Sequence, residues 1–93
     1  MNEETVLKLR YVDKTLERAE RLLCRAGRLL DELAQRIDRA LRFVGVGSRL
    51  NHERFGINRL FRTLTRVEDA CGDTAARIKR ARDTVTDLLN ELV

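Results

Sequence analysis

Apolar residues recur at alternating spacings of three and four along almost the whole chain. One series covers residues 9–44 and a second covers residues 50–92, with interruptions only at Glu53 and Thr74. Heptads sustained in this way are typical of helices that pack side by side in coiled coils and helical bundles. The spacing therefore predicts an all-α protein built from two long helices.

The segment between the two series contains Gly45, Gly47 and Ser48. Glycine commonly ends a helix in the left-handed conformation, and serine commonly caps the helix that follows. We therefore expect a single domain over residues 1–93, folded as an antiparallel, coiled-coil-like hairpin. Its parts are a helix over about 3–44, a turn at 45–48 and a helix over about 49–92.

An alternative is a three-helix arrangement, because Gly72 could end one helix and Asp73 could cap another. The heptad spacing passes through this point without a shift. The sequence therefore favours a continuous second helix, with a break near Gly72 as the alternative.

The composition excludes several classes of protein. The chain has 93 residues, no proline and four aromatic residues, which argues against an all-β fold and against an aromatic platform that stacks bases. A chain of this size rarely encloses a large catalytic pocket, and a single histidine forms no His cluster for a metal. We therefore expect no enzyme activity, no catalytic residues, no metal and no other cofactor.

No run of about 20 apolar residues predicts a membrane span, and the first residues lack the basic-then-apolar order of a signal peptide. We expect a cytoplasmic protein, with export without a cleaved signal peptide as the alternative.

The expected seam between the helices pairs residues whose numbers sum to 97. This register sets small side chains against large ones, such as Ala40 against Ile57, which dense packing favours. Cys71 then lies in the seam and Cys24 faces outward, so we expect two unpaired thiols. The expected seam also includes Val12, Leu33, Leu60, Val67 and Leu88.

Further apolar residues lie beside the expected seam, which widens the apolar stripe to three or four positions in each heptad. Such a stripe is typical of a helix that contacts two neighbours, whereas an isolated hairpin gives each helix only one. Two hairpins packed face to face as a four-helix bundle would cover it. The residues expected at this partner interface are Leu22, Leu29, Leu41, Phe43, Phe61 and Leu89.

Arginine is concentrated around the expected turn. Residues 36–66 contain eight arginines against Asp38 and Glu53, whereas residues 83–93 contain three acidic residues and no basic one. The turn is therefore a basic tip, and RNA, DNA, an anionic membrane or an acidic protein could contact it; a solvated basic face is the alternative. The expected anion or nucleic-acid contacts are Arg42, Arg49, Arg54, Arg59 and Arg62.

The pair His52-Glu53, within Asn51-His52-Glu53-Arg54, resembles the phosphoacceptor of histidine-kinase dimerisation and phosphotransfer domains. Those domains are also helical hairpins that form four-helix bundles. The resemblance implies a histidine phosphotransfer role for His52, with a surface histidine near a helix start as the alternative.

The hairpin also resembles the WXG-motif family exported by type VII secretion systems. That family carries Trp-x-Gly at a central turn, where this chain has Phe43-Val44-Gly45. The resemblance implies a secreted helical hairpin. The architecture is also similar to that of the Rop-type RNA-binding plasmid regulators, which dimerise into a four-helix bundle.

Taken together, these patterns predict an interaction or assembly module that self-associates as a homodimer or pairs with a related helical protein. The alternatives are an RNA- or DNA-binding bundle that uses the basic tip, a WXG-like secreted protein, and a phosphotransfer bundle that uses His52.

Overall fold

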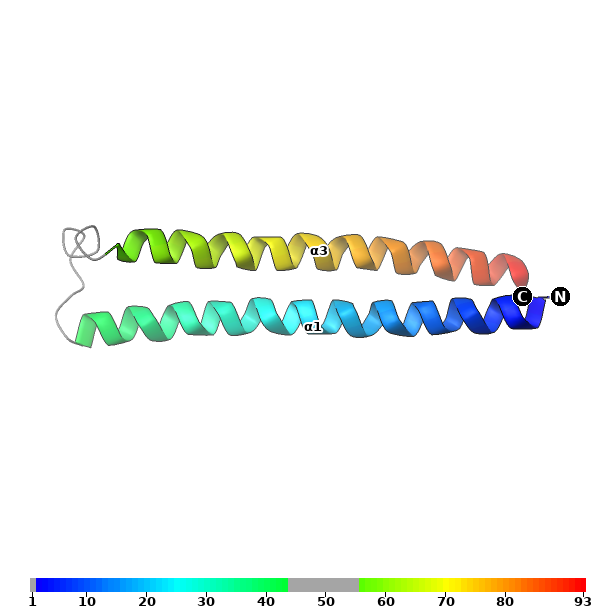
Figure 1. Ribbon diagram of the computed structural model, residues 1–93, viewed down its shortest axis with the longest axis horizontal. Coiled ribbons are helices and arrows are strands. Elements are labelled where there is room, and N and C mark those ends of the chain that lie inside the picture. Colours follow the sequence, from blue (N-terminus) through cyan, green and yellow to red (C-terminus); the bar gives the residue numbers. More distant parts are fainter. Residues whose placement is uncertain (1, 44–55) are drawn as a thin grey trace. The chain divides into compact units, whose positions relative to one another are not determined.

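The computed structural model describes residues 2–43 and 56–93, which form two helices and contain no strand. Helix α1 spans Asn2–Phe43 and helix α3 spans Ile57–Leu92. The predicted all-α fold of two antiparallel helices, as in a helical hairpin, is confirmed (Figure 1). The expected turn at 45–48 and residues 49–55 lie outside the described residues.

Residues at both ends of α1 and at the start of α3 favour helix termini there. Glu3 and Glu4 lie in the first turn of α1 and Arg42 lies in its last turn, so these charges oppose the partial charges of the helix dipole. Gly56 precedes α3 with a φ of 67° and its carbonyl oxygen accepts a hydrogen bond of 3.1 Å from the Leu60 amide. α3 continues through Gly72 without a break.

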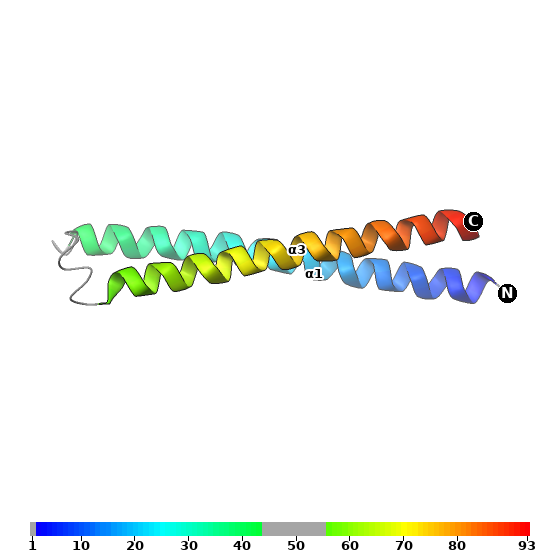
Figure 2. The ribbon, with the colours of Figure 1, turned by 90° about the horizontal axis from the view of Figure 1, so that it is seen from above.

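The chain divides into two compact units, each of which takes one part of both helices. Unit 1 comprises Met1–Cys24 and Gly72–Val93, and unit 2 comprises Arg25–Cys71. Within each unit, the segment of α1 lies beside the segment of α3 and runs in the opposite direction (Figure 1, Figure 2).

The seam between the helices follows the least exposed positions, which alternate at spacings of three and four. Ile57, Ala75 and Val85 are buried, and the other seam residues are half-buried. The seam residues of α1 are Val6, Leu9, Asp13, Leu16, Glu20, Leu23, Gly27, Leu30, Ala34, Ile37 and Leu41. Those of α3 are Ile57, Phe61, Leu64, Glu68, Cys71, Ala75, Ile78, Arg82, Val85, Leu89 and Leu92.

The prediction of the seam is wrong for about half of its residues. Every second expected position is correct, including Leu16 and Cys71, but the positions between them lie outside the seam. Because neighbouring residues differ by about 100° around a helix, this exchange turns the contact surface by about 50°. The expected residues Val12, Leu33, Leu60, Val67 and Leu88 are instead 42–46% exposed.

The pairing of the helices differs by one residue from the expected register. A Cβ atom placed on Gly27 would lie 3.9 Å from the Cβ of Cys71, so these two positions, whose numbers sum to 98, face each other within unit 2. Within unit 2, the same register sets the small Ala34 against Leu64. Small residues therefore still face large ones, as dense packing requires.

The glycines provide a test of helix continuity. Nothing lies within 4 Å of a methyl group added at Gly72, and alanine is about 1 kcal/mol more favourable than glycine inside a helix. We expect Gly72→Ala to raise the free energy of unfolding by about 1 kcal/mol, measured by urea denaturation.

The matched variant is Gly56→Ala, which should lower the free energy of unfolding by about 1–2 kcal/mol because its φ of 67° disfavours a Cβ atom. A loss of stability in Gly72→Ala would contradict a continuous α3.

Candidate functional site

A cluster of four charged side chains joins the two helices of unit 1. The Nε of Arg82 donates a hydrogen bond of 3.2 Å to Oδ1 of Asp13, and its Nη1 donates one of 3.0 Å to Oε2 of Glu20. Its Nη2 lies 3.8 Å from Oε2 of Glu17. The three carboxylates are spaced by about one helical turn, so a single guanidinium from α3 reaches all of them.

The cluster replaces an apolar layer with a half-buried ionic one. The Arg82 side chain is 29% exposed. The hydrogen bonds that Arg82 donates to Glu20 and, with a smaller effect, to Asp13 raise the pKa of Arg82 above its ordinary value, against a smaller effect of desolvation. A raised pKa means that this pairing stabilises the charged form of Arg82, and that this contribution is lost at high pH only as the pH rises through the raised pKa. The cluster is thus a structural contact, which the spacing of apolar residues did not predict.

Apolar side chains outside the seam form a second surface on each unit, and we call these residues together the apolar flank. The heptad positions next to the seam on α1 and α3 are occupied mainly by aliphatic residues, and the other side of the seam carries mainly polar ones. In an antiparallel pair, these equivalent positions of both helices lie on the same face. The flank comprises Val12, Ala19, Leu22, Ala26, Leu29 and Leu33 of α1, and Leu60, Val67, Ala81 and Leu88 of α3.

The structure separates the residues expected at a partner interface into two groups. Leu22 and Leu29 are exposed on the flank, and Phe43, at the end of α1, is 92% exposed. The other three, Leu41, Phe61 and Leu89, are half-buried in the seam of the hairpin itself.

The arginines expected to contact anions at the basic tip also fall into different groups. The Nε of Arg42 lies 3.1 Å from Oδ2 of Asp38, an ion pair within α1. Arg59 and Arg62 line a hollow of about 500 Å³ together with Thr63 and Arg66. Arg49, Arg54 and His52 lie outside the described residues.

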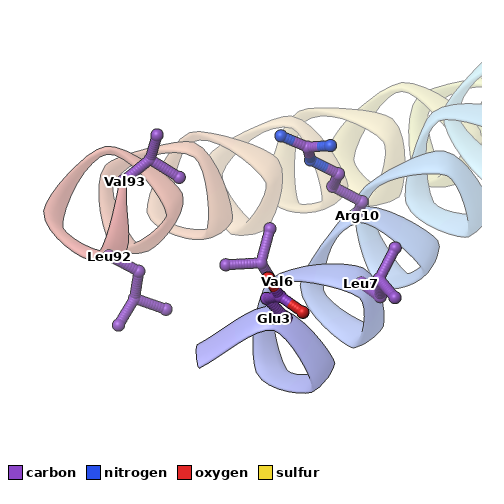
Figure 3. Close-up of a pocket in the computed structure, with 6 residues that line it drawn as sticks. All are labelled: Glu3, Val6, Leu7, Arg10, Leu92 and Val93. Carbon is purple, nitrogen blue, oxygen red and sulfur yellow. The ribbon is translucent and has the colours of Figure 1, made fainter. Parts of the chain in front are cut away.

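A second hollow, of about 440 Å³, lies in unit 1 between the start of α1 and the end of α3 (Figure 3). Four of its described lining residues are aliphatic: Val6, Leu7, Leu92 and Val93. Glu3 and Arg10 complete this lining, one of each charge. The aliphatic walls therefore suit hydrocarbon groups, with no excess of either charge.

Both cysteines are free, as predicted, with Cys24 exposed and Cys71 half-buried. Within the described residues, no three His, Cys, Asp or Glu side chains are grouped in a way that would hold a metal ion. Neither α1 nor α3, the helices of the described part, is long and apolar enough to span a membrane.

A comparison with known protein families, curated proteins and solved structures finds no match to this chain. The likeness to the WXG-motif family stays a prediction, and two of its three motif residues, Val44 and Gly45, lie outside the described residues. Function is therefore argued from the chain's own surfaces.

The Arg82 cluster yields a test. Arg82→Gln removes the cation shared by three carboxylates and leaves them close together without it, so we expect a clear fall in the midpoint of urea denaturation at pH 7. Arg80→Gln, a change at an exposed position of the same helix, is the matched control and should shift the midpoint little. Equal effects of the two changes would contradict the role of the cluster.

Proposed function

We propose that this protein is a helical assembly module, not an enzyme, and that it self-associates by packing the apolar flank of one copy against that of a second. The observation that carries the proposal is the position of the seam. It covers one side of the apolar stripe on each helix and leaves the other side, the flank, exposed.

An off-centre seam is what a four-helix bundle requires of each hairpin. A helix in such a bundle directs the middle of its apolar stripe toward the bundle axis and one edge toward each neighbour. The leucines and valines of the flank are 42–66% exposed. A second hairpin packed on this face would remove them from water.

The small core also supports association. Only Ile57, Ala75 and Val85 are buried among the described residues.

The distribution of charge favours two copies that run in opposite directions. In unit 2, residues 36–43 and 56–66 contain six arginines and one carboxylate, Asp38. In unit 1, residues 2–7 and 83–93 contain five carboxylates and no base. If the two copies run in opposite directions, the basic segments of one copy lie beside the acidic segments of the other. If they run in the same direction, like charges come together.

The order of residues on the flank of α1 gives the register that such a dimer would take. Val12 and Leu33 lie on either side of Ala19 and Ala26 along the helix. A two-fold axis between the two alanines would set Val12 of one antiparallel copy beside Leu33 of the other.

The oligomeric state is the direct test. We expect sedimentation to show a dimer at about 50 μM, which corresponds to an affinity of about −6 kcal/mol or tighter. Val67→Glu places a charge on the flank that the second copy would bury, and it should give monomers or raise the dissociation constant by at least about tenfold. Thr65→Glu, at an exposed position outside both seam and flank, is the matched control and should leave the dimer intact.

A second measurement covers the case in which Val67→Glu fails to fold. If folding is coupled to dimerisation, the midpoint of thermal unfolding of the unchanged protein rises with protein concentration. A monomer at about 50 μM with a concentration-independent midpoint would contradict self-association, and a different helical partner would then become the leading proposal.

Cysteine cross-linking tests the direction. In a Cys24→Ser/Cys71→Ser background, a mixture of Val12→Cys and Leu33→Cys chains should form a mixed disulfide, because antiparallel copies of α1 bring these positions together. A mixture of Leu33→Cys and Val67→Cys chains is the matched control, since those positions meet only when the copies run in the same direction. A disulfide in the control mixture alone would contradict opposite directions while leaving the dimer itself supported.

A further inference from the structure

Three arginines of unit 2 surround the hollow near the start of α3. Arg59, Arg62 and Arg66 line it together with Thr63, and its volume is about 500 Å³. Their spacing of three and four residues places them on neighbouring turns of one side of the helix. Thr63 is held in place because its Oγ1 donates a hydrogen bond of 2.9 Å to the carbonyl oxygen of Arg59.

These guanidinium groups have no carboxylate partner within the described part of the chain. Arg21, Arg42 and Arg82, in contrast, each pair with one or more carboxylates. α3 also has no acidic residue in its first turn. Arg59 lies in this turn, where the partial positive charge of the helix start adds to that of the side chains. The hollow therefore combines like charges that no described acidic group neutralises.

We propose that Arg59, Arg62 and Arg66 bind the phosphate groups of a nucleic-acid backbone. Guanidinium groups donate paired hydrogen bonds to phosphate oxygens, and phosphate supplies the negative charge that the hollow lacks. No aromatic side chain lines the described wall of the hollow, so this wall offers bases no aromatic stacking partner. The contact is to phosphates and is independent of base sequence.

A polyanion fits this site better than a single phosphate does. The three arginines are exposed, so water weakens each individual contact and several must act together. From Arg59 to Arg66 the helix rises by about 10 Å, and one nucleic-acid strand carries about three phosphates over that distance. Each guanidinium thus has a phosphate within its reach.

The site does not depend on the proposed self-association. Arg59, Arg62 and Arg66 belong neither to the seam nor to the apolar flank. A second copy packed on the flank leaves them accessible, and a monomer presents them equally. Loss of self-association therefore does not remove this site.

Salt-dependent binding of the full chain tests the proposal. A mixed-sequence DNA duplex and a structured RNA, each titrated by fluorescence anisotropy at several salt concentrations, should give a logarithm of the binding constant that falls linearly with the logarithm of salt. Arg59→Gln/Arg62→Gln/Arg66→Gln should make the slope for the duplex shallower by about 2.7, since each phosphate that is no longer neutralised changes it by about 0.9.

The control removes the same charge from α1, at exposed positions with no ion pair in the described structure: Arg18→Gln/Arg25→Gln/Arg28→Gln. It should make the slope shallower by less than the α3 variant does. Circular dichroism checks that both variants keep their helices.

Binding to DNA or to RNA with these slopes supports the site, and the two titrations show which nucleic acid it prefers. Absence of binding to both at low salt overturns it, because electrostatic attraction is strongest there. Equal slope changes in the two variants overturn it as well, since the charge then acts without a defined site. Competition by inorganic phosphate as effective, per phosphate, as by the duplex would overturn the preference for a polyanion.

Discussion

The structure depends on one geometric constraint: a helix that pairs with a single neighbour covers only one edge of an apolar stripe that is three or four positions wide. In this chain the covered edge contains Phe61 and Ala75 of α3, and the uncovered residues include Leu60 and Val67. The register, the ionic layer and the exposed flank all follow from this choice. Because neighbouring positions differ by about 100°, a rotation of about 50° separates the two arrangements.

The chosen seam includes charged residues, which makes the contact between the helices specific. Asp13 and Glu20 face Arg82 across unit 1, whereas an aliphatic layer would tolerate displacement along the seam. Half-buried ionic contacts add little net stability after desolvation, but they disfavour registers in which the charges have no partner. The hairpin thus combines a specific seam with a small core, and a second copy on the flank would supply the remaining apolar burial.

The outer surfaces divide between two kinds of contact. The flank offers aliphatic side chains without hydrogen-bonding groups, which suits another helix. The side of α3 that carries Arg59, Arg62 and Arg66 offers guanidinium groups that no described carboxylate neutralises, which suits phosphate. Because the two surfaces share no residue, assembly and anion binding do not compete for the same side chains.

The spacing of apolar residues is a local property, and it was enough to predict two antiparallel helices, the free thiols of Cys24 and Cys71 and a stripe too wide for one neighbour. It could not decide between Leu60 and Phe61 as seam residues, because both are large and apolar and differ only by a rotation of the helix. Nor could it show that Arg82 pairs with Asp13 and Glu20. Those outcomes depend on how side chains from different helices meet in space, so only the tertiary structure decided them.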